Sequence, residues 1–208
     1  GGNGGRTRRL VGLWRTLFLF LTAVGVALAV NQILSLQFFA GVALLDNSFL
    51  YLLLACFLSP AFLVFPATAG QAGQPPPLLD KALFALCLVI SLYFAATGLV
   101  SLEEGWEFES PRLAVALAFV LWVLIMEAVR RAGGTAIFVI FGVLSLYPVF
   151  ADASFVPAML SGLEQDIMAT ARYHVLSEES VLGIPMRVFG TLIVGFILFG
   201  VALQTTGG

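Results

Sequence analysis

Two long apolar runs joined by a short charged hinge constrain this chain more than any other feature of its sequence. The runs cover residues 113–126 and 135–150, and the hinge between them reads Glu127-Ala-Val-Arg-Arg-Ala-Gly-Gly134. A helix needs roughly 17–25 apolar residues to cross the hydrocarbon core of a bilayer, and each run is close to that length. The pattern therefore predicts two membrane-spanning helices that reverse direction at the hinge.

The composition agrees with a chain surrounded by lipid. Of its 208 residues, 60% are hydrophobic and only 11% are charged, whereas a soluble domain carries about 25% charged residues. The formal net charge of -2 argues against a nucleic-acid partner, because phosphate binding needs concentrated Lys and Arg. We therefore predict an all-α polytopic membrane protein.

Hydropathy divides the chain into about six crossings and one interfacial amphipathic helix. The predicted spans are residues 10–30, 49–67, 82–100, 113–127, 135–150 and 183–203. Residues 33–45 either extend the first helix or lie in the interface. Within residues 151–180, a helical stripe predicts an amphipathic helix along the membrane; its apolar members are Met159, Leu160, Leu163, Ile167, Tyr173 and Leu176.

The basic residues orient these spans, because Lys and Arg in short loops favour the cytoplasmic side. Those that we place inside are Arg6, Arg8, Arg9, Arg15, Lys81, Arg130 and Arg131. Arg112, Arg172 and Arg187 fall outside, as does an acidic loop with Trp106 and Phe108 that suits the outer interface. The asymmetry predicts a cytoplasmic N-terminus.

The basic front before the first apolar run is also typical of a signal peptide. The length of the run, and the lack of a small-residue cleavage site before Asn31, favour a retained helix. The chain begins at Gly1 rather than Met and stops at Gly208 just after an apolar run, so we expect a piece of a longer protein.

No residue pattern in the chain points to catalysis, to a bound cofactor or to a metal. His174 is the only histidine, and we interpret it as a solvated loop residue. Cys56 and Cys87 form no CxxC pair and lie within apolar runs. Zinc sites need several ligands at fixed spacing, and nucleotide sites need glycine motifs that are missing here. We predict no enzyme; the alternatives are a small intramembrane enzyme that uses His174 and a nearby serine, and a structural membrane protein.

Glu127 is the most informative charged residue. Arg130 and Arg131 follow it at positions i+3 and i+4, so either can pair with it on one helix face. An unpaired acid in hydrocarbon would cost a few kcal/mol. We interpret the three residues as a structural ion-pair lock at the cytosolic boundary, with a latch to a partner helix or domain as the alternative.

Two segments resemble one family of membrane transporters. The segment from Glu127 to Gly134 resembles the Glu-x-x-Arg-Arg-x-x-Gly hinge in the fused membrane subunits of TRAP (tripartite ATP-independent periplasmic) transporters. Glu179-Ser-Val-Leu-Gly-Ile-Pro-Met186 is similar to that family's Glu-Gly-x-x-Gly-Ile-Pro-Leu helix. The residues that follow in register are Thr191, Phe196, Leu198-Phe-Gly200, Leu203 and Gln204-Thr-Thr-Gly207. The likeness runs from about Asp80 to the end of the chain.

The chain departs from the family pattern at three places. Thr135-Ala-Ile-Phe138 follows the hinge where a Trp and a Pro are usual, and Ser180 and Arg187 each replace a Gly. The resemblance implies that residues 1–131 form four scaffold helices, like the small membrane subunit, and that residues 132–208 begin the large transporting subunit. It gives structural or topological roles to Glu127, Arg130, Arg131, Gly134, Gly183 and Pro185.

The resemblance also implies a function. Such permeases sit in the inner (plasma) membrane of bacteria or archaea and take up an organic acid, driven by a sodium gradient. A periplasmic solute-binding protein, of the TAXI type for many fused forms, delivers the substrate. The expected partners are that binding protein, the rest of the large subunit and the lipid bilayer. The substrate and sodium sites belong to helices mostly downstream of Gly208, so no transport residue is assigned here.

Overall fold

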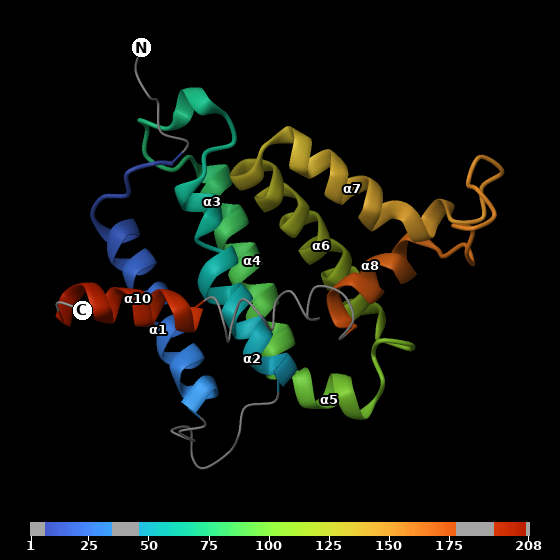
Figure 1. Cartoon of the computed structure of the whole chain (residues 1–208), viewed down its shortest axis with the longest axis horizontal. Coiled ribbons are helices and arrows are strands. Elements are labelled where there is room, and N and C mark those ends of the chain that lie inside the picture. The colour runs from blue at the N-terminus through green and yellow to red at the C-terminus, as the bar shows by residue number, and fades with distance from the viewer. Residues whose placement is uncertain (1–6, 35–45, 178–193, 207–208) are drawn as a thin grey trace.

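All regular elements that the structure describes are helices. The computed structural model describes residues 7–34, 46–177 and 194–206 (Figure 1). Four of the described helices are long and apolar enough to cross a membrane: Leu13–Leu34, Asn47–Val64, Leu78–Ala96 and Arg112–Gly133. The predicted all-α class is confirmed over the described residues. The predicted count of about six spans is not confirmed, since residues 183–193 of the last one lie outside the description.

Helix α1 (Leu13–Leu34) starts just after Gly12, whose backbone has φ 58°. It begins three residues later than the predicted span and includes Ile33 and Leu34, so the first helix does run past residue 30. Residues 35–45 of the ambiguous stretch lie outside the described chain. Gly25 lets α1 approach its neighbour closely, because a Cβ there would stand 2.7 Å from the Phe57 ring.

The second predicted span is broken into pieces. Helix α2 (Asp46–Leu53) continues as the π-helical turn η1 (Leu54–Leu58), and α3 (Ala61–Val64) follows after a bend. Pro60 explains the break, because it has no N–H to donate and its ring crowds the preceding turn. The Ser59 N–H instead bonds the Leu54 carbonyl, five residues back, at 3.3 Å. A short 3₁₀ turn, η2 (Ala69–Gln71), follows.

The third predicted span is shifted toward the N-terminus. Helix α4 (Leu78–Ala96) begins directly after Pro77, which suits a helix start, and it stops at Thr97 rather than at residue 100. A separate short helix, α5 (Gly98–Glu103), follows. Trp106, in the loop that we predict at the outer interface, is only 4% exposed, and its Nε1 donates to Glu104 at 2.7 Å.

Helices α6 (Arg112–Gly133) and α7 (Thr135–Phe150) form the predicted hairpin. Ala114 and Ala118 are fully buried in α6, and such small residues allow close helix packing. Gly134 connects the helices with φ 86° and ψ 175°, a combination open essentially to glycine alone. No residue of α7 is buried, and the helix extends away from the α1–α4 part of the bundle (Figure 1).

The predicted amphipathic helix is only partly correct. Helix α8 covers Ile167–Leu176, and the Asp166 side chain caps it by accepting from the Met168 and Ala169 N–H groups. Met159, Leu160 and Leu163 lie before the helix in an exposed loop, so the predicted stripe across residues 159–176 was wrong. Pro157 and Gly162 interrupt that stretch, since neither residue favours a helix interior.

Helix α8 packs against α6 rather than lying free on a surface. Ala171 and Val175 are buried, and the Tyr51 hydroxyl of α2 donates to the Val175 carbonyl at 2.7 Å. Helix α10 (Val194–Thr206) lies across α1 at the other side of the molecule (Figure 1). The core therefore centres on α2, α3, α4 and α6, with α7 and α8 added on one side.

Replacing Gly134 with Ala should destabilise the protein by about 1–3 kcal/mol, because a Cβ makes the observed backbone conformation strained. The measurement is the thermal midpoint of the detergent-solubilised protein. Gly73→Ala is the control, since a Cβ at Gly73 meets nothing within 4 Å. Equal midpoints for the two variants would mean that the hinge does not need glycine.

Candidate functional site

A carboxylate sealed from water lies at the centre of the candidate site. Asp80 stands in the first turn of α4 and is only 1% exposed. Its Oδ1 atom lies 2.8 Å from Nη1 of Arg131, and its Oδ2 atom lies 3.0 Å from Nη1 of Arg8. The two arginine side chains are 1–2% exposed, so these are ion pairs in a dry environment.

Glu127 extends the pairing along α6. It accepts from Nε and Nη2 of Arg130 and from Nε of Arg131, each at 2.7 Å. The Arg130 contact is bidentate, which is the strong geometry for a guanidinium on a carboxylate. The predicted pairing of Glu127 with both arginines is confirmed. Arg131 thus bridges Glu127 on its own helix to Asp80 on α4.

Backbone carbonyls at the end of α3 complete the cluster. Nη1 of Arg8 donates to the Leu63 carbonyl at 2.9 Å, and Nη1 of Arg131 donates to the Phe65 carbonyl at 3.3 Å. The last carbonyls of a helix lack partners within the helix and carry partial negative charge, so cations are favoured there. The Arg131 guanidinium also lies over the Phe62 ring, 5.3 Å from its centre.

We call Arg8, Asp80, Glu127, Arg130 and Arg131 the charge cluster. It joins the segment before α1, the end of α3, the start of α4 and the end of α6. Buried ion pairs add little net stability, but removing one partner leaves an uncompensated charge. We therefore interpret the cluster as the contact that fixes which helix ends meet and in what register.

Asp80 and Arg8 were missed as members of the site. The sequence placed Arg8 among several N-terminal arginines and treated Asp80 only as the opening of a span. A signal was present, because an acid in the first turn of an apolar helix demands a partner. The partner could not be named, since Arg8 and Arg131 lie 72 and 51 residues away in sequence.

A second polar group joins α6, α7 and α8. Nε1 of Trp122 donates to the Ser145 hydroxyl at 2.6 Å, and Nε2 of His174 lies 2.7 Å from the Ser145 carbonyl. The His174 ring also stacks on Trp122, with centres 5.9 Å apart. The interpretation of His174 as a solvated loop residue was wrong, because it lies in α8 and packs on an aromatic ring.

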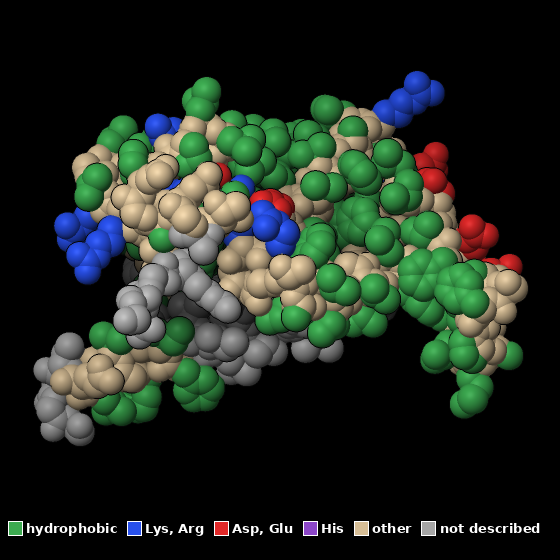
Figure 2. Space-filling model, turned by 90° about the horizontal axis from the view of Figure 1, so that it is seen from above, with side chains coloured by type: hydrophobic (Ala, Val, Ile, Leu, Met, Phe, Trp, Pro, Cys, Tyr) green, Lys and Arg blue, Asp and Glu red, His purple; other side chains and the backbone are tan. Residues whose placement is uncertain are grey.

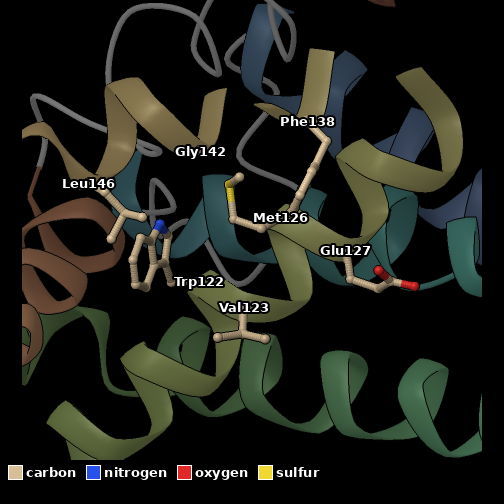
Figure 3. Close-up of a pocket in the computed structure, with 7 residues that line it drawn as sticks. All are labelled: Trp122, Val123, Met126, Glu127, Phe138, Gly142 and Leu146. Atoms are coloured by element: carbon tan, nitrogen blue, oxygen red, sulfur yellow. The ribbon is translucent and has the colours of Figure 1, made fainter. Parts of the chain in front are cut away.

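The structure contains an open cleft of about 290 Å³ between α6 and α7 (Figure 3). Its walls are Trp122, Val123, Met126, Glu127, Phe138, Gly142 and Leu146. Figure 3 shows the Glu127 carboxyl group at the end of the cleft away from Trp122 and Leu146. Because the arginines already bind that carboxylate, the cleft offers mainly apolar contact.

The structure brings together four of the six predicted structural residues: Glu127, Arg130, Arg131 and Gly134 lie at the end of α6. Gly183 and Pro185 lie outside the described residues. The described part of the chain contains no group of three or more His, Cys, Asp or Glu that could hold a metal ion. Cys56 and Cys87 are buried.

No protein family, curated protein or solved structure matches the chain.

Asp80→Asn should destabilise the protein by about 3–5 kcal/mol, because Arg8 and Arg131 lose their shared counter-charge in a buried site. Adding Arg8→Gln should recover part of the loss, since it removes one of the two stranded cations. The measurement is the folded fraction after heating, followed by size-exclusion chromatography.

The control for this series is Asp152→Asn, which changes an exposed carboxylate outside the cluster. It should leave the folded fraction unchanged. A double variant that is less stable than Asp80→Asn alone would contradict the charge argument.

Proposed function

We propose that this chain is the N-terminal part of the permease component of a TRAP secondary transporter. The permease would use a sodium gradient to take up an organic acid that a periplasmic solute-binding protein delivers. In this proposal, residues 1–131 are the scaffold helices and residues 132–208 open the transport domain. The chain would sit in the plasma membrane of a bacterium or archaeon with its N-terminus inside.

The observation that carries the proposal is the charge cluster at the hinge. The motif that resembles the TRAP family, Glu127 to Gly134, is also the place where the ends of three apolar helices are tied together. Such a clamp suits a scaffold, because a scaffold must keep its helices in place while another domain moves. Gly134 then connects α6 to α7, where the transport domain would begin.

The character of α4 also supports a scaffold role. This helix carries no charged residue between Ala82 and Ala96. Transport sites are built from polar groups and interrupted helices near the middle of the membrane. We therefore place the substrate and sodium sites in the rest of the complete protein, and we assign none of their residues here.

A structural membrane protein without transport activity is the second candidate, and the same clamp favours it. An intramembrane enzyme has less support, since the His174 ring is packed on Trp122 and its Nε2 atom faces a backbone carbonyl. Uptake by the complete protein separates the two leading candidates, because only the transporter moves a substrate.

A reporter fused directly after Arg131 should read as cytoplasmic, and a reporter fused near Glu104 should read as periplasmic. The reason is that basic residues of short loops stay inside, and α6 connects the two positions by one crossing. Paired alkaline phosphatase and green fluorescent protein fusions measure this. The reverse pattern would overturn the proposed orientation.

The transport proposal is tested with the complete protein in proteoliposomes. Uptake of radiolabelled organic acids should require both the solute-binding protein and an imposed sodium gradient. Uptake that continues without a gradient, or no uptake with any acid of the panel, would contradict the proposal.

In the same assay, Glu127→Ala should lower the maximal rate in proportion to the loss of folded protein, by about tenfold or less, and leave the apparent KM unchanged. The physical reason is that Glu127 holds Arg130 and Arg131 and would not touch the substrate. Glu164→Ala, an exposed acid, is the control. A raised KM at a normal folded level would give Glu127 a role in substrate binding instead.

A further inference from the structure

A surface of cations that no described carboxylate pairs with lies where α1 and α4 begin. We call Arg9, Arg15 and Lys81 the basic rim. Arg9 and Arg15 are exposed, Lys81 is partly exposed, and Nζ of Lys81 lies 5.4 Å from the centre of the Trp14 ring. Lys81 follows Asp80 in sequence and Arg9 follows Arg8, so the rim lies beside the buried pair of those two residues. Trp14 ties the two helix starts together.

No described carboxylate neutralises the basic rim. Asp80, which is adjacent to Lys81, is buried and already bound by Arg8 and Arg131. Within the described residues, the ion pairs are those of the charge cluster, and none involves a rim residue. Among the described residues, the rim therefore presents three positive charges without a counter-charge, and an external anion would neutralise them.

Large apolar side chains that neighbour these cations in the sequence are exposed. Val11 and Leu13 at the start of α1 are 72% and 76% exposed, and Leu78 and Leu79 at the start of α4 are 81% and 63% exposed. Exposed apolar side chains are unfavourable in water, and charged side chains are unfavourable in hydrocarbon. A surface of this kind matches the boundary between the headgroups and the acyl chains of a lipid leaflet.

The positive charge of the basic rim determines which class of lipid it favours. Basic groups at a membrane surface attract anionic headgroups, and a pocket of such groups next to membrane helices favours anionic over neutral lipid. The opposite end of α4 leads to an acidic loop with Glu103, Glu104, Glu107 and Glu109. Figure 2 shows basic side chains at one edge of the face, basic and acidic side chains together near its middle, and acidic side chains with one further basic group at the other edge, among extensive hydrophobic surface.

We propose that the basic rim is a binding site for an anionic phospholipid. Arg9, Arg15 and Lys81 hold its phosphate, and the acyl chains cover Val11, Leu13, Leu78 and Leu79. Trp14 lies at the level of the headgroup, where an indole ring is favoured. This inference rests on the placement of the chain in a membrane under the proposed function, but not on transport.

The test uses the full chain in nanodiscs of phosphatidylcholine, alone or mixed with phosphatidylglycerol. Native mass spectrometry counts retained lipid, and the thermal midpoint reports stability. We expect phosphatidylglycerol to be retained preferentially and to raise the midpoint. Each rim cation that is neutralised should weaken the retention roughly fivefold, so the Arg9→Gln, Lys81→Gln double variant should lose most of it.

Arg112→Gln is the matched control, because it removes one exposed cation at the start of α6, away from the rim. It should retain phosphatidylglycerol as the parent protein does. The midpoint of the double variant in pure phosphatidylcholine shows whether it folds. If the double variant does not fold, the single variant Arg15→Gln is measured in its place, and it should weaken phosphatidylglycerol retention roughly fivefold.

Three results would overturn the proposal. The first is equal retention of the two lipids, and the second is an equal loss of phosphatidylglycerol retention in the rim variants and in Arg112→Gln. The third is the same rise in thermal midpoint from inorganic phosphate alone, which would indicate a site for a free anion. Sodium-driven uptake is measured separately in proteoliposomes, so a failure of the transport proposal leaves the lipid result standing.

Discussion

The buried carboxylate of Asp80 is the constraint on which the rest of the structure depends. Moving a charged group out of water costs several kcal/mol, and only close opposite charges with further hydrogen bonds offset that cost. Asp80 obtains opposite charges from Arg8 and Arg131, which approach from distant parts of the chain, and it accepts a hydrogen bond from Arg131. Because both arginines also bind carbonyls at the end of α3, one carboxylate decides how the segment before α1, α3, α4 and α6 meet. Apolar packing alone would leave such helices free to slide, since it has no preferred direction.

The hinge at Gly134 connects the charge cluster at the end of α6 to the second group of helices, α7 and α8. Arg130 and Arg131 hold the end of α6, and the glycine then reverses the chain into α7 without steric strain. The hydrogen bond between Trp122 and Ser145, and the stacking of His174 on Trp122, tie α7 and α8 back to α6. The apolar cleft lies between these two sets of contacts, and Gly142 contributes no side chain to fill it.

Charge is distributed unevenly between the two ends of the helices. The charge cluster and the basic rim lie where α4 begins and α6 ends, whereas the acidic loop lies between the end of α4 and the start of α6. The cluster and the rim do different things with similar residues. In the cluster, Arg8 and Arg131 are buried, and carboxylates and carbonyls bind them, which gives structure. In the rim, cations remain at the surface beside exposed leucines, which gives a surface for a partner.

The order of residues alone determined the local features: the apolar runs predict helices, Gly134 predicts a reversal, and the i+3 and i+4 spacing predicts the pairing of Glu127 with Arg130 and Arg131. Each depends on residues a few positions apart, so the sequence contains all the information. The break at Pro60 changes one helix locally, and propensity alone did not reveal the π-helical turn before it. Only the tertiary structure decided that Arg8 and Arg131 meet at Asp80, that His174 stacks on Trp122, and that Trp106 is buried. Those contacts join residues that are distant in sequence or depend on packing from other helices, and hydropathy carries no record of which helix faces which.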